Sequence, residues 1–408
     1  MSTSTDNRPR LWVISELYYP EETSTGYYLT RIAEGLADKF DVKVISGQPN
    51  YAARGTKAPR REIRKHVEIY RVSGTTWDKN VIAFRLINMA TLSLSVLFRS
   101  IASFRSGDRV LVVTNPPSMP FVVALGSVVR GAVYSLLIHD NYPEILVAAG
   151  KVCPGSRFVS LMQRLNRWLY KNTSKIIVVG RDMSELVRRK TNGLETPVTF
   201  IPNWAELESV SPMSRDQNKL LGDLNLRDKF VLLYAGNMGP PNDIESIVAA
   251  AELLRKDDCF HFVFLGAGVK KVGLVNEVQD RGLSNVTVLD PKPRSEQIVF
   301  LNACDVALVS LVDKMLGVSV PSRTYNILAA GKPILALADE ASEVARIVTE
   351  ENVGWVVPPG DPRLLADTIR SIKARTADLT SMGRRARHAA EEKYSRAIAI
   401  KKYRDAVN

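Results

Sequence analysis

Short runs of apolar, β-branched residues alternate along this chain with longer stretches whose apolar positions recur at helical spacing. The apolar runs are nearly continuous, which is typical of parallel strands buried on both faces. In the first half of the chain they cover residues 11–15, 42–46, 67–72, 109–113, 132–138, 175–179 and 198–201. Helical patterns lie between most of these runs. The first half is therefore predicted to form a doubly wound α/β domain.

The same alternation restarts after a polar stretch at residues 205–228. Its strand-like runs cover residues 230–236, 260–266, 285–289, 306–310, 333–338 and 354–358. The pattern predicts two Rossmann-like domains that face a central cleft, one over 1–204 and one over 205–390. The last stretch, 391–408, is predicted to be a helix that can pack back on the first domain. In open parallel sheets ligands bind at the carboxyl ends of the strands, and the helix N-termini there favour phosphate.

Hydropathy and cysteine usage predict a chain that stays in a reducing compartment. The most apolar long stretch, 81–98, is interrupted by Arg85 and Asn88, so it falls short of the roughly 18 uncharged apolar residues that a membrane span needs. The first ten residues are polar and have no signal core, so we expect a cytoplasmic location. The three cysteines are far apart and show no metal-ligand spacing, and no metal site is expected.

The positive charge is concentrated in the first half of the chain. The net charge of the whole chain is +12, and residues 1–203 alone hold 28 Lys and Arg against 16 Asp and Glu. A dense basic run lies at 54–71, with Arg54, Lys57, Arg60, Arg61, Arg64, Lys65 and Arg71. Such a basic half is typical of binding to nucleic acid, to an anionic membrane or to an anionic substrate, and a solvated basic loop is the alternative.

Three glycine-containing turns follow predicted strands. The first is Ser24-Thr25-Gly26, which opens a helix and could bring backbone close to a phosphate. The second contains Gly236, Asn237 and Gly239, and the third contains Gly266 and Gly268. None of them matches a dinucleotide or Walker A fingerprint, and each is equally compatible with an ordinary strand–helix turn.

Two polar groups at strand ends are candidates for catalysis. His139 and Asp140 follow the strand at 132–138, where a histidine can bind a substrate hydroxyl and an aspartate can position an acceptor or act as a base. A structural turn is the alternative for this pair. Ser322, Arg323 and Thr324 precede an apolar helical stretch. The hydroxyls are predicted to cap that helix and Arg323 to pair with a diphosphate.

Taken in order, these motifs resemble the retaining GT-B glycosyltransferases of family 4, in the branch that builds bacterial surface polysaccharides. The resemblance spans nearly the whole chain. It is carried by TNPPSMP, IHDNYPE, IPNWAE, YAGNMG, FLGAG, LNACDVALVSL and VPSRTYNILAAGKPILA. It implies transfer of a sugar, hexosyl or N-acetylhexosaminyl, from a nucleotide-diphosphate sugar, with UDP as the expected nucleotide, to a lipid-linked or other glycan acceptor. It also implies that no metal or other cofactor is required.

The chain departs from the family pattern at two positions. Alignment on Ala-Gly-Lys-Pro places Val318 and Asn326 where many members have glutamates. The resemblance therefore implies that Asn326 holds the donor ribose through an uncharged hydrogen bond. The usual Arg and Lys near the diphosphate are also missing, which leaves Arg323 as the substitute cation.

The resemblance also assigns roles around the cleft. The diphosphate is expected between Gly26, the Asn237–Gly239 loop and residues 322–324. His139 is expected to contact the donor sugar, and Glu343 either sugar hydroxyls or the phosphate edge. A charge at a helix N-terminus is the alternative for Glu343. The first domain is expected to bind the acceptor at the cytoplasmic face of the inner membrane. The residues expected to serve there are Arg60, Arg61, Arg64, Lys65 and Arg85.

Three other functions stay open at this point. A non-hydrolysing sugar-nucleotide epimerase would share the two-domain shape, but it needs acid–base groups at the cleft and the chain has 4 His in all. A non-catalytic subunit of a polysaccharide assembly complex would explain the departures from the family pattern. Nucleic-acid binding fits the charge, but no binding module accompanies it, so no nucleic-acid partner is expected.

Overall fold

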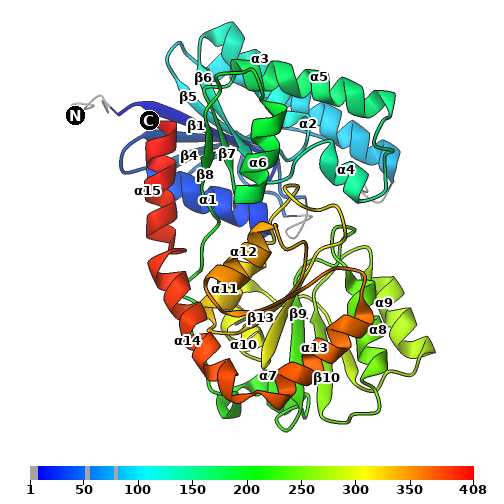
Figure 1. Cartoon of the computed structure of the whole chain (residues 1–408). Helices are drawn as coiled ribbons and strands as arrows, with labels where there is room; N and C mark the ends of the chain where they lie inside the picture. The colour runs from blue at the N-terminus through cyan, green and yellow to red at the C-terminus, as the bar shows by residue number, and fades with distance from the viewer. Residues whose placement is uncertain (1–7, 51–55, 78–80) are drawn as a thin grey trace.

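Two β-sheets, one above the other, organise the chain (Figure 1). The computed structural model describes residues 8–50, 56–77 and 81–408. Arg54 of the basic run and most of the polar N-terminal stretch lie outside these described residues. Within them, the two parallel-sheet domains of a GT-B fold that the sequence predicts are confirmed.

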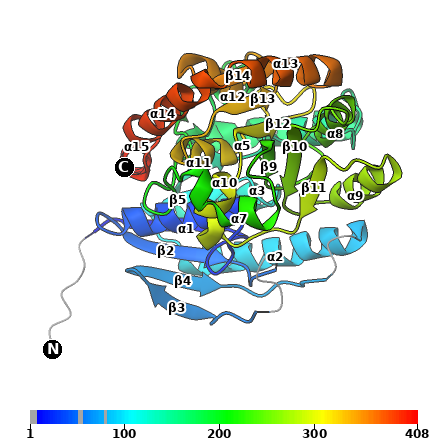
Figure 2. The same cartoon turned by 90° about the horizontal axis from the view of Figure 1, so that it is seen from below.

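The N-terminal sheet has the order β3-β4-β2-β1-β5-β6-β7-β8. Its strands are β1 (Arg10–Ser15), β2 (Asp41–Ser46), β3 (Arg61–Arg64), β4 (Val67–Arg71), β5 (Arg109–Val113), β6 (Val133–Ile138), β7 (Lys175–Val178) and β8 (Val198–Phe200). All neighbouring pairs are parallel except β3 and β4. Figure 2 shows this hairpin at the outer edge of the sheet. Strand β3 was not predicted, because three of its four residues are charged.

The helices of the first half connect these strands. They are α1 (Ser24–Leu36), α2 (Ile82–Ser103), α3 (Met119–Arg130), α4 (Glu144–Ala148), α5 (Arg157–Asn172) and α6 (Arg181–Lys190). Helix α3 contacts both α2 and α5, so these three helices form one layer. Because β1 leads to β2 on one side and β5 leads to β6 on the other, right-handed crossovers place α1 and this layer on opposite faces of the sheet.

The C-terminal sheet is parallel throughout, in the order β11-β10-β9-β12-β13-β14. Its strands are β9 (Phe230–Ala235), β10 (Phe260–Leu265), β11 (Val286–Leu289), β12 (Val306–Ser310), β13 (Ile334–Leu337) and β14 (Gly354–Val357). Successive side chains of a strand point to opposite faces. Accordingly, Val231 and Leu233 belong to one buried cluster and Leu232 and Tyr234 to another, so helices cover both faces.

The helices of the second half complete these two layers. They are α7 (Lys219–Asp223), α8 (Ile244–Leu253), α9 (Lys271–Asp280), α10 (Gln297–Leu301), α11 (Arg323–Ala329), α12 (Glu343–Glu350), α13 (Pro362–Ala374), α14 (Ala377–Glu392) and α15 (Arg396–Val407). Side chains of α8 and α13 pack in one cluster, and those of α11, α12 and α14 pack in the other.

The last helix, α15, returns to the N-terminal domain (Figure 1). Ile400 and Tyr403 are buried in the N-terminal core cluster. A Cβ atom added to Gly35 of α1 would lie 2.8 Å from the Ile400 side chain, so the two helices are in close contact. Arg404 forms an ion pair with Asp38 at 2.7 Å. The chain therefore crosses between the domains twice.

Tyr403→Ala tests how far α15 contributes to the N-terminal core. The Tyr403 side chain is 1% exposed, and truncating a buried aromatic side chain typically costs about 3 kcal/mol. We expect that loss of unfolding free energy in urea titrations followed by circular dichroism. Lys401→Ala, at an exposed position of the same helix, is the matched control and should change stability little. Equal effects of the two substitutions would contradict the packing of α15 described above.

Candidate functional site

The loops after the strands of the two sheets meet each other across the domain boundary. Asn141, after β6, donates through its backbone N–H to the carbonyl of Val318 at 2.9 Å and through Nδ2 to the carbonyl of Gly317 at 2.7 Å. The hydroxyl oxygens of Ser24 and Ser322 lie 2.6 Å apart. The carboxyl ends of the two sheets therefore face each other across one interdomain region, and we call its N-terminal and C-terminal sides its two walls.

Arg323 lies at the centre of the C-terminal wall. Its guanidinium lies over the ring of Tyr234, with 4.5 Å between Cζ and the ring centroid, and Nη2 donates to Oδ1 of Asn242 at 3.1 Å. Nη1 is buried and has no hydrogen-bond partner among the described residues. A covered guanidinium nitrogen without a partner is costly, so this atom is available to an anionic ligand.

The predicted glycines bring the loops after β9 and β10 into contact. A Cβ atom on Gly266 would lie 1.9 Å from the carbonyl oxygen of Gly236, and one on Gly268 would lie 2.4 Å from that of Met238. The N–H groups of Gly236 and Gly266 already donate to the carbonyls of Leu265 and Leu289. These two glycines are therefore required for loop packing rather than as phosphate donors.

Other amides of the same loops remain available. The N–H groups of Asn237, Gly239 and Gly268 have no hydrogen bond to any part of the chain that the structure describes. A Cβ atom on Gly239 would lie 2.8 Å from Nδ2 of Asn237, which keeps this turn tight. Of the predicted donor-binding glycines, Gly239 and Gly268 are thus the ones with an amide to offer.

The structure corrects the predicted cap of α11. Ser322 is the N-cap residue but makes no side-chain cap hydrogen bond, because its hydroxyl contacts Ser24 of the other domain instead. Thr324 is fully buried, and its Oγ1 has no partner among the described residues. Neither hydroxyl therefore caps the helix, and that of Ser322 reaches across the domain boundary.

Gly26 also has a different role from the predicted one. Its N–H points to Oγ1 of Thr23, which caps α1, at 3.4 Å. A Cβ atom at this position would lie 2.7 Å from the carbonyl of Glu21. Gly26 therefore allows the chain to fold over the start of α1, and its amide is not free for a phosphate.

His139 and Asp140 lie on the N-terminal wall, directly after β6. Nε2 of His139 is fully covered and has no partner among the described residues. Burial lowers the pKa of His139 to about 4, so the imidazole is neutral near physiological pH. Asp140 pairs with Ser319 of the opposite domain. Burial raises the pKa of Asp140, and the hydrogen bond from Ser319 opposes that shift.

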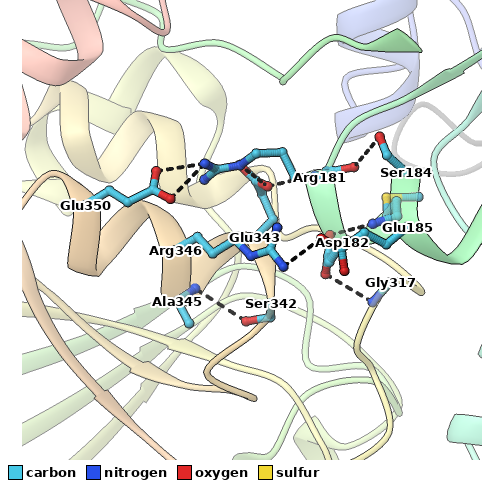
Figure 3. A network of polar contacts seen from close by, with 12 residues as sticks. Arg181, Asp182, Ser184, Glu185, Gly317, Ser342, Glu343, Ala345, Arg346 and Glu350 are labelled. Atoms are coloured by element: carbon cyan, nitrogen blue, oxygen red, sulfur yellow. Dashed lines mark hydrogen bonds and ion pairs between the residues drawn. The ribbon is translucent and has the colours of Figure 1, made fainter. Parts of the chain in front are cut away.

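Glu343, for which a sugar or phosphate contact was predicted, lies between the two domains. It is 1% exposed, and its carboxylate accepts two hydrogen bonds from Arg181 of α6, at 2.7 Å from the backbone N–H and 2.9 Å from Nε (Figure 3). Burial raises the pKa of Glu343, and the contacts with Arg181 oppose that shift. Glu343 is therefore a contact between the domains, and its contact with a donor stays a prediction.

Two further contacts extend this interdomain network (Figure 3). Asp182 is buried and accepts a hydrogen bond from the N–H of Gly317 at 3.0 Å. Burial raises its pKa. Arg346 of α12 pairs with Glu185 of α6 at 2.8 Å. The start of α6 is thus joined to α12 and to the loop that carries Ser319.

Asn326 also takes part in the domain connection. It is buried, and its Oδ1 accepts the backbone N–H of Glu206 at 2.9 Å. Glu206 in turn accepts a hydrogen bond from Nε1 of the buried Trp204. The predicted ribose contact would therefore have to use the Asn326 amide nitrogen, because the oxygen is engaged in the linker.

The basic residues proposed for the acceptor are mostly paired with carboxylates. Arg61 pairs with Glu68, and both Arg64 and Lys65 pair with Glu34. Arg60 and Arg85 are exposed. The described part of the basic run is therefore largely paired within the β3–β4 hairpin and with Glu34 of α1, and its role toward the acceptor stays a prediction.

Arg294 was not predicted, yet it reaches across the domain boundary. It follows β11, and its Cζ lies 3.8 Å from the ring centroid of Tyr27 on α1. Its Nη1 is buried without a partner among the described residues. No motif surrounds Arg294 in the sequence, so only the contact with a residue 267 positions earlier reveals it.

Two hollows border the region where the domains meet. One of about 430 Å³ opens at the ends of β12 and β13 and is lined by residues 311–316 and 338–340. A small one of about 20 Å³ lies beside Asp140, between the ends of β5 and β6 and the helices α3 and α5. A larger hollow of about 590 Å³ lies beside α14, at the amino ends of β12 and β13 and away from their carboxyl ends. Among the described residues no cluster of His, Cys, Asp and Glu could hold a metal ion.

Comparison with known proteins adds two family matches and a set of relatives. The model of "Glycosyl transferases group 1" matches residues 216–389, and that of "Glycosyl transferase 4-like domain" matches residues 24–204. The probable glycosyltransferase WbjE of Pseudomonas aeruginosa is 32% identical over 97% of this chain and 96% of its own. The putative colanic acid biosynthesis glycosyl transferase WcaI of Escherichia coli is 26% identical over 86% of this chain and 89% of its own.

Solved structures share the fold. A sucrose-phosphate synthase from Thermosynechococcus elongatus superposes with a TM-score of 0.77 at 17% identity, covering 97% of each chain. HepE from Anabaena, in complex with UDP-glucose, superposes with a TM-score of 0.70 at 15% identity, covering 97% of this chain and 98% of its own.

His139→Gln tests the buried neutral imidazole. The pKa of His139 is about 4 in the folded chain, and its ordinary value is 6.5. As the pH falls from 6.5 toward 4, the histidine of the unfolded chain is protonated while that of the folded chain stays neutral, which favours unfolding. This group should therefore make the wild type lose about 2 kcal/mol of stability between about pH 7 and about pH 5. Urea unfolding at both pH values should show a smaller loss in His139→Gln. Identical pH dependence would mean that His139 is not buried.

Arg181→Ala tests the ion pair between the domains. It leaves the Glu343 carboxylate buried without its cation, which should cost about 3 kcal/mol. The double variant Arg181→Ala/Glu343→Gln should recover much of that loss, since no buried charge then remains. Arg346→Ala is the control, because its partner Glu185 is 53% exposed and such pairs contribute at most about 1 kcal/mol. Thermal and urea unfolding would measure all four proteins, and a double variant as unstable as Arg181→Ala would refute the pairing.

Proposed function

The chain belongs to the group 1 glycosyl transferases, and we propose that it moves a hexosyl or N-acetylhexosaminyl group from a UDP-linked sugar to a lipid-linked glycan in cell-surface polysaccharide synthesis. We propose further that the anomeric configuration is retained and that the donor is the only cosubstrate besides the acceptor. Two relatives support the setting, since WbjE is named a probable glycosyltransferase and WcaI a putative colanic acid glycosyl transferase. HepE, with the same fold, binds UDP-glucose.

The observation that carries the proposal is the unpartnered guanidinium nitrogen of Arg323. It lies at the carboxyl edge of the C-terminal sheet, beside the loop of Asn237 and Gly239, whose N–H groups are free among the described residues. In sugar transfer, negative charge develops on the departing diphosphate. A fixed guanidinium and backbone amides in a covered site stabilise that charge where it appears.

The opposite wall suits the sugar and the acceptor. The neutral imidazole of His139 has a covered Nε2 that can exchange a hydrogen bond with a sugar hydroxyl without carrying a charge. Asp140 lies next to it and can orient the acceptor hydroxyl. No residue is assigned as a nucleophile. Instead we propose that the acceptor attacks from the face that the diphosphate leaves, and that the departing phosphate takes the acceptor proton.

The location follows from the proposed acceptor. A lipid-linked glycan is held at a bilayer, so the protein would act as a peripheral enzyme on the cytoplasmic face of the inner membrane. The N-terminal domain, which carries His139 and Asp140, would bind that acceptor.

Arg323→Ala tests the donor site through thermal stabilisation by UDP, UDP-sugars and the corresponding monophosphates. A ligand at about 100 times its dissociation constant adds about 2.7 kcal/mol to the stability of the folded state. We expect a shift of the melting temperature with a diphosphate nucleotide in the wild type. The shift should largely vanish in Arg323→Ala. It should be partly kept in Arg323→Lys, because lysine retains the positive charge but lacks the planar guanidinium that can donate two parallel hydrogen bonds.

Arg370→Ala is the matched control. It removes the same charge from the same domain at an exposed position paired with Asp367. Its nucleotide shift should equal that of the wild type. If no nucleotide stabilises the wild type, or if Arg323→Ala responds as fully as Arg370→Ala, the proposed donor site is refuted.

A further inference from the structure

Three neighbouring helices of the N-terminal domain expose large hydrophobic side chains to solvent. Helices α2, α3 and α5 form the layer on the face of the sheet opposite α1 (Figure 1). They carry more than half of the exposed large hydrophobic residues in the described part of the chain. Those residues are Ile82, Phe84, Leu86, Ile87, Leu94, Phe98, Leu125, Val128, Val129, Phe158, Leu161, Leu165 and Trp168. We call this surface the α2–α3–α5 face. A soluble monomer seldom leaves so many apolar side chains together in water.

The charge of this face is entirely of one sign. None of the three helices contains an Asp or Glu, whereas basic residues occur on each of them. The basic residues on the exposed side are Arg85, Arg130, Arg157, Arg164, Arg167 and Lys171. Arg99 of α2 instead packs over the ring of Tyr70, with its Nε buried. On α5, Arg157, Leu161, Arg164 and Trp168 are all exposed and recur at helical spacing, so cations and apolar groups share one stripe.

Helix α2 lies along the domain rather than apart from it. By length and composition it is the one helix of the described chain that could cross a membrane, although Arg85 and Asn88 interrupt its apolar sequence. One side of it is nevertheless buried: Leu92 and Val96 belong to the N-terminal core, and Ser93 Oγ lies 2.7 Å from Ser118 Oγ at the start of α3. Asn88 is buried and donates to the carbonyl of Trp77 at 2.9 Å. Only the opposite side, with Leu94 and Phe98, is available to a partner.

We propose that the α2–α3–α5 face is the surface on which this protein rests on an anionic lipid bilayer, with the helix axes along the membrane plane. Apolar side chains such as Phe98 and Trp168 would enter the boundary between headgroups and acyl chains, and Arg157 and Arg164 would contact lipid phosphates. A helix layer that combines exposed apolar and basic side chains with no carboxylate matches this chemistry. This assignment rests on the proposed function, which gives the acceptor a lipid anchor, and deepens it by naming the surface that meets the lipid.

The β3–β4 hairpin is the weaker alternative for the same contact. Its arginines at 61 and 64 and Lys65 are paired with Glu68 and Glu34, so less of their charge is free for lipid. Arg157 and Arg164 make no ion pair with any described residue, and no carboxylate lies on their own helix. The two surfaces can therefore be separated by substitution.

Sedimentation with vesicles tests the assignment. The full-length protein is mixed with vesicles of phosphatidylcholine alone or of phosphatidylcholine with phosphatidylglycerol, at low and at high salt. We expect binding to the vesicles that contain phosphatidylglycerol, with a large loss at high salt, because each basic residue near an anionic surface contributes about fivefold in affinity.

Matched substitutions locate the surface. Phe98→Ser combined with Trp168→Ser, and separately Arg157→Glu combined with Arg164→Glu, should each lower the affinity at least about fivefold. Val272→Ser on α9, exposed to 71%, and Arg363→Glu at the start of α13 make similar changes on the other domain and should bind as the wild type does. All of these variants should keep the nucleotide-induced thermal shift of the wild type, so this test and that of the donor site fail independently.

Three results would overturn the assignment. The first is a wild type that does not sediment with phosphatidylglycerol vesicles or sediments equally with neutral ones. The second is that both double variants of the α2–α3–α5 face bind vesicles as well as the wild type does, whereas Arg61→Glu loses binding. The third is self-association of the wild type in sedimentation velocity that Phe98→Ser/Trp168→Ser abolishes while vesicle binding persists, because the face would then join two copies of the chain.

Discussion

The structure depends on one buried ion pair that spans its two domains. Glu343 is almost completely shielded from water, and a carboxylate in that position is tolerated only with a cation against it. Arg181, at the start of α6 in the other domain, supplies both a guanidinium and a backbone N–H. Because α6 follows β7 and α12 follows β13, this pair holds the carboxyl edges of the two sheets face to face.

That closed arrangement determines the chemistry of the site. It covers polar atoms that find no partner in the described chain: Nε2 of His139 on one wall, and Nη1 of Arg323 and Nη1 of Arg294 on the other. The same burial keeps the imidazole neutral, while the guanidinium stays charged at any physiological pH. The N-terminal wall thus suits the neutral hydroxyls of a sugar, and the C-terminal wall suits the negative charge of a diphosphate. Separating the domains would hydrate these groups again and weaken their electrostatic effect.

The sequence predicted the strands well and the contacts between domains poorly, for one physical reason. A strand of a parallel sheet is buried on both faces, so it appears in the sequence as a continuous apolar segment, as at 109–113 and 306–310. Strand β3 lies at an edge and is mostly charged, so it was missed. His139 was singled out because it directly follows a strand, and Arg323 because it opens a helix between two hydroxyl residues. The contact of Glu343 with Arg181 was not predicted, because the two residues are 162 positions apart and a capping glutamate looks the same in sequence. Likewise, Leu94 and Phe98 have the spacing of core residues, and only the structure shows them exposed.

The surface proposed to face lipid and the wall proposed to bind the acceptor are two sides of the same helices. The small hollow beside Asp140 is lined by Pro120 and Phe121 of α3 and by Met162 and Asn166 of α5. The outer sides of these two helices carry Val128, Leu161 and Trp168. A bilayer against the outer side would thus lie one helix diameter, about 10 Å, from the hollow. A sugar chain anchored in that bilayer needs only to pass the end of α3 or α5 to reach Asp140. With the acceptor held in an anionic bilayer, as proposed, the absence of carboxylates from α2, α3 and α5 follows, since an acidic residue there would repel that bilayer.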